Sequence, residues 1–296
     1  MKIMEDFHYW KFKRKIAPYL FLLPGLIMLS LFFFWPILNT FRYSFCKYDV
    51  ITPPVYIGLQ NYNRLLTDQS FIQALQNTVK YSLIVVPCLI VIPLFLALLI
   101  DQNLKYIKFF RVLYYLPRIM SLVVAGVIWK FMFQSDGVIN SLLTFVGFGK
   151  VGWLSSPKVA IFSVAILTIW IASAYYMIIY LAGLQSIPVS LIESAKIDGA
   201  SKFRRLWHII IPLMKPYILT VTLVSTVGAM RVFGEVYILT SGGPGGATNV
   251  LTYFVYQRAF SFMKMGYASA AASILLGILI IVSIIYMYLF SKGEIK

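Results

Sequence analysis

The sequence has 296 residues, of which 60% are hydrophobic, 17% are aromatic and only 12% are charged. This composition is far more apolar than that of a soluble globular protein, and it excludes a chain that hides its apolar side chains in a soluble core. The formal net charge of +16 leaves a nucleic acid and a membrane surface open as partners, so the placement of the charges has to decide between them.

The first apolar stretch follows a basic segment that contains Lys11, Lys13, Arg14 and Lys15, as a signal peptide would. The segment that begins at Trp35 offers no small residues for cleavage, so we expect a retained first span. Five more stretches of about 20 apolar residues follow, each long enough to cross a bilayer. The predicted spans are 17–39, 79–100, 112–133, 159–183, 217–240 and 266–290.

All six spans are expected to be helices, because only a helix satisfies its backbone polar groups within its own segment in lipid, and the alternating pattern of a membrane barrel is missing. Kinks are predicted at Pro24, Pro87 and Pro93. The prediction is an all-α membrane protein with one transmembrane domain over residues 1–296.

Basic residues are more frequent in alternate loops, which sets the orientation. They favour the two ends of the chain, the loop near 102–111 and the loop 184–216. We therefore expect both termini and the loop 184–216 in the cytoplasm, and we expect the net charge to report topology rather than a nucleic-acid partner. The two cysteines, Cys46 and Cys88, have no metal-binding spacing, so no metal site is expected.

The loop 184–216 reads as two short helices around a turn. Pro188 suits the start of the first helix, with Ser190 as a possible cap, and Gly199 suits a stop at which φ is positive. The second helix has a mainly apolar face with basic neighbours, a pattern that suits docking into a groove on a partner. That face comprises Phe203, Leu206, Trp207 and Ile210. A helix lying flat on the inner leaflet is the alternative.

The residues Glu193-Ser194-Ala195, Gly199 and Ile209-Ile210-Ile211-Pro212 resemble the EAA motif of binding-protein-dependent ABC importer permeases, Glu-Ala-Ala-x-x-x-Gly followed by nine residues and Ile-x-Leu-Pro. Ser194 and Ile211 depart from the motif by small changes. The sequence from Lys196 to Ser201 resembles that of the carbohydrate branch of the family, the relatives of the maltose and glycerol-phosphate permeases. Further short matches in the same order extend the resemblance over nearly the whole chain.

The resemblance implies a type I ABC importer permease fold and a subunit that performs no chemistry itself. The EAA loop would seat in a cleft of an ATPase subunit, and Glu193, Ser194, Ala195, Asp198, Gly199, Ile209 and Pro212 would be the coupling residues. The implied partners are a second, similar permease in a heterodimer, two ATPase subunits and an extracytoplasmic solute-binding protein. ATP and Mg would bind to the ATPase subunits and no cofactor to this chain, in a bacterial cell membrane.

Polar residues inside spans are costly and mark candidate positions on a substrate path. Two faces and one charged pair are candidates: Thr168, Ala172 and Tyr175; Ser225, Gly228, Ala229 and Val232; and Arg231 with Glu235. An aromatic ring, hydroxyls and small residues together suit a sugar. For each residue a bond to a neighbouring helix is about as expected as sugar contact. Arg231 and Glu235 are expected either to pair with each other across one helical turn, which is favoured, or to contact an acidic substrate.

Gly242, Gly243 and Pro244 form a turn that is expected outside, where the family contacts its binding protein; a plain connection between spans is the alternative. The most favoured function is ATP-driven import of a sugar or oligosaccharide. Other solutes, such as a phosphate ester or a peptide, stay open within the same transporter class. A membrane-embedded transferase is less favoured because the ten acidic residues are scattered rather than clustered.

Overall fold

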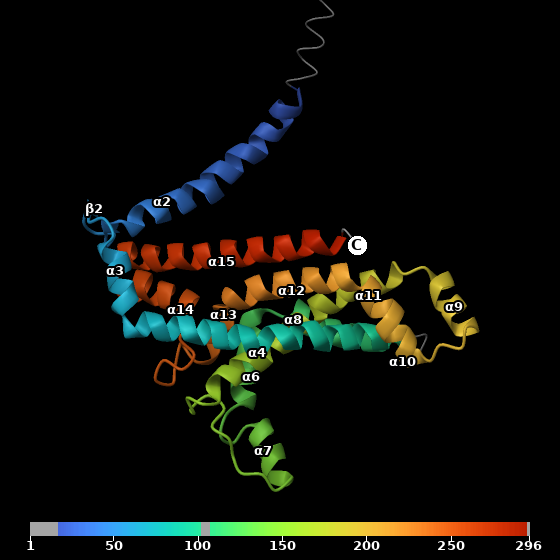
Figure 1. The fold of residues 1–296 in the computed structure, drawn as a ribbon. Coiled ribbons are helices and arrows are strands. Elements are labelled where there is room, and N and C mark those ends of the chain that lie inside the picture. Colours follow the sequence, from blue (N-terminus) through green and yellow to red (C-terminus); the bar gives the residue numbers. More distant parts are fainter. Residues whose placement is uncertain (1–16, 102–106, 295–296) are drawn as a thin grey trace, which may run out of the picture.

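The computed structural model describes residues 17–101 and 107–294, which form a bundle of long helices with short helices at both ends (Figure 1). Four helices are long and apolar enough to cross a membrane: Ala17–Ser44, Gln69–Ile100, Ala160–Gln185 and Met265–Leu289. Two bent pairs, Val112–Ile119 with Leu122–Met132 and Lys202–Leu213 with Lys215–Met230, raise the number to six if each pair is one span.

The elements follow one another along the chain, with π-helical segments written η. They are η1 (Ser30–Phe34), α2 (Trp35–Ser44), β1 (Cys46–Lys47), β2 (Val55–Tyr56), α3 (Gln60–Thr67), α4 (Gln69–Ile100), α5 (Ile107–Ile119), α6 (Leu122–Met132), α7 (Val138–Phe145), α8 (Ala160–Gln185), α9 (Val189–Ile197), α10 (Lys202–Arg205), η2 (Leu206–Ile210), α11 (Ile211–Leu213), α12 (Lys215–Met230), α13 (Gly234–Leu239), α14 (Leu251–Tyr256), η3 (Gln257–Ser261) and α15 (Met265–Glu294). The strands β1 and β2 pair antiparallel.

The predicted spans need three corrections. The second helix begins at Gln69 rather than near residue 79, because the Asp68 carboxylate accepts a hydrogen bond from the Ser70 N–H and caps a polar first turn. The third span is broken by a 104° bend between Ile119 and Leu122. The fifth ends at Met230, and α13 is a separate helix, so 217–240 is not one continuous span.

The two breaks in the spans lie near other prolines than those at which the sequence predicted kinks. Pro87 and Pro93 lie inside α4, which runs through both of them as one helix of 32 residues. The 104° bend instead follows Pro117, the proline of α5, and a second bend of 65° follows Leu213. Packing against neighbouring helices therefore allows α4 to continue through its two prolines. The two bends lie at the junction of α5 with α6 and at the junction of α11 with α12.

The core lies where α4, α8 and α12 meet. Tyr81, Met177, Tyr180 and Val221 are fully buried there. The Tyr81 hydroxyl donates a 2.5 Å hydrogen bond to the Thr168 hydroxyl and ties α4 to α8. The helix over Ala17–Ser44 is different: it meets α15 at the α2 end, diverges from the bundle in Figure 1 and leaves its apolar side chains exposed.

At the end of the bundle that carries α3, the hairpin of β1 and β2 packs tightly on α15. The Asn61 amide donates 2.9 Å hydrogen bonds to the carbonyls of Ser44 and Cys46. The Gly266 N–H donates to the Tyr48 carbonyl, and a Cβ built on Gly266 would lie 2.0 Å from the Cys46 carbonyl oxygen. Only glycine fits this contact without a shift of backbone.

Gly266→Ala should therefore lower stability by about 1–3 kcal/mol, the usual cost of overpacking. Gly277→Ala in the same helix is the matched control, because a Cβ there meets no heavy atom within 4 Å. Thermal unfolding of the purified proteins in detergent checks this. Equal melting temperatures for the two variants would show that the hairpin does not hold α15 as described.

Candidate coupling site and transport path

The two predicted short helices of the loop 184–216 are present, and the turn between them is a Schellman motif. The helix α9 ends at Ile197 with Asp198 as its C-cap, and Gly199 follows with φ +78°. The Gly199 N–H donates to the Lys196 carbonyl, and the Ala200 N–H donates to the Ala195 carbonyl. These two bonds satisfy the last carbonyls of α9, and the positive φ they need is the reason for a glycine here.

The second short helix starts at Ser201, whose hydroxyl accepts a hydrogen bond from the Arg204 N–H. The Arg205 guanidinium donates to the Ala200 carbonyl, which fixes the angle between the turn and α10. The first helix is capped at Pro188 without a side-chain hydrogen bond, so Ser190 is not its cap. The turn is therefore rigid although its surface is open.

Most of the predicted coupling residues lie on that open surface. Glu193, Ser194, Asp198, Gly199 and Pro212 are exposed, and Ile209 is half-buried. Ala195 is buried under α9 and packs the helix against the rest of the protein. The helices α9 and α10 project at one end of the bundle, and Glu193 and Ser194 lie on α9 (Figure 1).

The predicted apolar face of the second helix is split in two. Ile210 packs against the core, while Phe203 and Trp207 point outward with 71% and 54% of their surface exposed and ring centroids 6.0 Å apart. Ile197, at the end of α9, is 87% exposed. We name Ile197, Phe203 and Trp207 the apolar coupling patch; such a patch on a projecting unit is typical of a protein interface.

Both ends of this unit are attached firmly to spanning helices. A Cβ on Gly183 of α8 would lie 2.6 Å from the Tyr217 ring of α12, so the two helices touch without room for a side chain. The Tyr217 hydroxyl donates to the Ser186 hydroxyl at 3.1 Å, and Met214 is fully buried beside Gly183. A displacement of the coupling unit must therefore move the ends of α8 and α12 together.

The candidate path residues divide into open and buried positions. Tyr175, Gly228 and Arg231 are exposed and Ala172 is half-buried, whereas Ser225, Ala229 and Val232 are buried. The Thr168 hydroxyl accepts a hydrogen bond from the Tyr81 hydroxyl. The Ser225 hydroxyl donates to the Thr222 carbonyl within its own helix. The open positions suit solute contact. The Thr168 hydroxyl instead joins α4 to α8, and the Ser225 hydroxyl bonds within α12.

The expected pair of Arg231 and Glu235 is not formed within the described residues. The helix α12 ends at Arg231, and α13 begins at Gly234, so the two side chains do not sit one turn apart on a continuous helix. The i,i+4 expectation failed because it assumed an unbroken span.

Arg118, at the bend between α5 and α6, is a path candidate that the spans alone did not single out. Its guanidinium lies 5.3 Å from the centre of the Tyr175 ring, a cation–π contact. Arg118 forms no ion pair with any residue that the structure describes. The available signal was a basic residue inside the predicted span 112–133, although that span also contains Lys130. An intramembrane charge without a structural partner usually has a function.

An apolar cavity of about 620 Å³ lies next to this pair, between α4, α5, α6 and α8. Trp170 and Trp129 line it with ring centroids 5.6 Å apart, and Pro117 and Ser173 contribute to its wall. The Ser173 hydroxyl donates to the Ile169 carbonyl of its own helix, so the cavity offers mainly aromatic rings, which suit the apolar face of a sugar ring.

The glycine-rich loop lies at the end of the bundle opposite α9 and α10 (Figure 1). Gly242 is buried against the Tyr253 ring with φ +81°, while Gly243 and Pro244 are half-buried. The Asn77 amide donates to the carbonyls of Gly246 and Asn249, and the Thr248 hydroxyl donates to that of Gly243. The loop is thus a pinned turn that offers Gly243 and Pro244, rather than Gly242, to a partner.

Residues 70–294 match the family model described as the binding-protein-dependent transport system inner membrane component. The arabinooligosaccharides transport system permease protein AraP of Bacillus subtilis is 33% identical over 96% of this chain and 92% of its own length. The lactose transport system permease protein LacF of Rhizobium radiobacter is 36% identical over 91% of this chain and 92% of its own length.

A solved bacterial ABC transporter involved in the import of the acidic polysaccharide alginate contains a chain of the same fold. It superposes with a TM-score of 0.85 at 25% identity, over 96% of this chain and 99% of that one. The predicted all-α fold with six spans is confirmed, with two of the spans bent.

Proposed function

Because the chain belongs to the family of binding-protein-dependent transport system inner membrane components, we propose that it is the membrane permease through which an ABC importer moves a sugar or oligosaccharide. The observation that carries the proposal is the rigid coupling unit of α9 and α10, whose two ends hold the close-packed α8 and α12. Relatives whose names state a cargo transport arabinooligosaccharides and lactose, which supports a carbohydrate cargo.

Two ATPase subunits bind ATP and Mg, and the apolar coupling patch seats in a cleft of one of them. When the ATPases close, the unit is pushed and the ends of α8 and α12 move together. A second, similar permease completes the cavity, which opens alternately to the two sides. An extracytoplasmic solute-binding protein delivers the solute at the end that carries the glycine-rich loop, and both termini lie in the cytoplasm.

This chain binds and guides the solute without breaking bonds. Tyr175 and Trp170 offer aromatic surfaces to pyranose rings, Ala172 is a small residue on the same helix, and Gly228 leaves room on α12. No step of the cycle requires a cofactor in this subunit.

A second candidate, favoured by Arg118, is that the cargo carries negative charge. A guanidinium that faces an aromatic ring inside a span and has no ion-pair partner among the described residues suits the carboxylate of a uronic acid. The carbohydrate proposal does not depend on this refinement.

Reconstitution of the permease pair with its ATPases in liposomes tests the proposal. Labelled oligosaccharide should enter only when binding protein is outside and ATP inside, and ATP hydrolysis should rise with loaded binding protein. Uptake that needs neither ATPase nor binding protein would refute an importer subunit. Uptake of a peptide or phosphate ester in preference to every saccharide tested would refute the carbohydrate cargo alone.

A further inference from the structure

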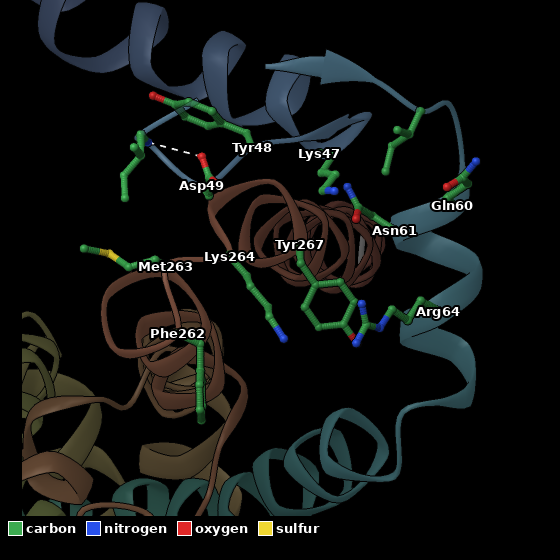
Figure 2. A pocket seen from close by; sticks show the side chains of 12 residues that line it. Lys47, Tyr48, Asp49, Gln60, Asn61, Arg64, Phe262, Met263, Lys264 and Tyr267 are labelled. Carbon is green, nitrogen blue, oxygen red and sulfur yellow. Dashed lines mark hydrogen bonds between the residues drawn. The ribbon is translucent and has the colours of Figure 1, made fainter. Parts of the chain in front are cut away.

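A cavity of about 570 Å³ lies at the end of the molecule opposite the coupling unit, between the β1–β2 hairpin, α3 and the start of α15 (Figure 2). Basic side chains enter it from three elements: Lys47 from β1, Arg64 from α3 and Lys264 just before α15. In Figure 2, Arg64 and Lys264 extend toward the Tyr267 ring from different sides, and Lys47 lies next to Asn61.

The single acidic residue in the lining does not balance these charges. Three basic residues against Asp49 leave a formal excess of two positive charges. The Asp49 carboxylate is occupied by its own loop, where it accepts hydrogen bonds from the Thr52 N–H and hydroxyl at 2.8 Å each. Those bonds hold the pKa of Asp49 below its ordinary value, and no ion pair joins Asp49 to a basic residue that the structure describes.

Asp68, the nearest acid outside the lining, is also occupied. Its carboxylate accepts a 2.8 Å hydrogen bond from the Tyr267 hydroxyl and lies 3.6 Å from the Arg258 guanidinium. Burial opposes its ionisation, but the hydrogen bonds from Tyr267 and Ser70 and the charge of Arg258 together hold its pKa below the ordinary value. The Asp68 charge is therefore neutralised by Arg258. Arg64 has no ion-pair partner among the described residues and lies over the Tyr267 ring, 5.3 Å from its centre.

The walls of the cavity are fixed, although the basic side chains at its mouth are exposed. Asn61 ties α3 to the hairpin, and Gly266 ties the hairpin to α15. The Lys264 N–H donates to the Arg258 carbonyl at 2.8 Å. The three basic side chains are exposed and therefore remain hydrated: Lys47, Arg64 and Lys264. Hydrated charges on a rigid frame steer and orient a partner rather than bind a small anion tightly.

The rim around the cations indicates what kind of partner this is. Among the lining residues, Ile51 is 83% exposed, and Phe262 and Met263 are each 49% exposed. An apolar and aromatic rim around arginine and lysine is typical of a protein interface, whereas a site for a free carboxylate has no use for exposed apolar neighbours.

From this charge excess and this rim, we propose that the cavity is a docking socket for acidic side chains of the extracytoplasmic solute-binding protein. The proposal rests on the proposed function and adds to it a second contact, formed by Lys47, Arg64 and Lys264, beside the glycine-rich loop. Lysine and arginine here pair with Asp or Glu carboxylates on a lobe of the partner and set its orientation over the bundle.

The double variant Lys47→Gln/Lys264→Gln tests the socket in the reconstituted complex. The measurement is ATP hydrolysis as a function of loaded binding-protein concentration. We expect the half-saturating concentration to rise by about tenfold, since each exposed charge pair at an interface contributes up to about 1 kcal/mol and 1.4 kcal/mol is a factor of ten. The maximal rate should be unchanged, and the dependence on salt should weaken.

Lys158→Gln, which removes an exposed cation outside the cavity, is the matched control and should leave the half-saturating concentration unchanged. Arg64→Gln, which keeps both lysines, should raise that concentration by a smaller factor. An unchanged half-saturating concentration in the double variant, or an equal rise in the control, would overturn the socket. A wild-type complex that ignores binding protein altogether would overturn the proposed function itself, which separates the two failures.

Free oligouronate added without binding protein separates a protein partner from a small anion. At the concentrations used in the assay, it should neither stimulate hydrolysis nor compete with binding protein at this cavity. Competition that disappears in Lys47→Gln/Lys264→Gln would assign the cavity to the saccharide and overturn the docking proposal.

Discussion

Gly199→Val should abolish import while the permease still assembles in the membrane. Gly199 has φ +78°, and a β-branched residue in that conformation is strained by roughly 1–2 kcal/mol. The Schellman bonds to Ala195 and Lys196 would weaken, and the angle between α9 and α10 would change. Because 1.4 kcal/mol is a factor of ten and docking is also misaligned, we expect uptake to fall by more than about tenfold.

The matched control is Gly149→Val, since Gly149 lies in an open loop with no heavy atom within 4 Å of its Cβ and has no positive φ. Both variants should reach the membrane in equal amounts, which immunoblots of membrane fractions check. Uptake and binding-protein-stimulated ATP hydrolysis should fall together in Gly199→Val alone. If Gly199→Val transports like the wild type, the turn is not the coupling element.

The second large effect is expected at Arg118. If the cargo is acidic, Arg118→Glu places a carboxylate opposite Tyr175 where the solute's own carboxylate passes, and import of an oligouronate should fall about 30-fold or more. The magnitude follows from the cost of about 2–5 kcal/mol when one partner of a desolvated charge pair is lost. Arg118→Lys should keep part of the activity, because it retains the charge but not the planar stack on the ring.

The readout is uptake of an oligouronate compared with a neutral oligosaccharide of the same length. Arg118→Glu should impair the acidic cargo selectively while ATP hydrolysis coupled to binding protein persists. Equal losses for both cargoes would show that Arg118 holds the bend between α5 and α6 rather than the solute. Preference of the wild type for the neutral cargo would refute the acidic candidate and leave the carbohydrate proposal standing.

Spanning helices and the coupling loop were predictable because local rules decide them. Length and hydrophobicity fix a helix in lipid, and Gly199 has the positive φ that its place after a short helix suggested. The bends were not predictable in the same way. Kinks were predicted at Pro87 and Pro93, yet α4 contains both without a break. The third span instead turns by 104° just after Pro117, a proline at which no kink was predicted.

The candidate path was the least predictable part, because it depends on which face of each helix is covered. Helical spacing alone grouped Ser225 and Ala229 with Gly228, but packing buries the first two and leaves Gly228 open. Arg118 and Trp170 became candidates only when α5 and α6 were placed against α8. The socket cations are also far apart in the sequence, and the fold brings Lys47, Arg64 and Lys264 to one cavity.

The central claim is that the unit of α9 and α10 faces the cytoplasm and receives force from a separate ATPase. A single cysteine at Ile197, in a chain whose Cys46 and Cys88 are replaced by serine, tests it most directly, because Ile197 is 87% exposed. A membrane-impermeant maleimide should label this cysteine in inside-out vesicles stripped of the ATPase, not in intact cells, and rebinding of the ATPase should protect it. Labelling from outside intact cells, or labelling that the ATPase does not reduce, would contradict the account.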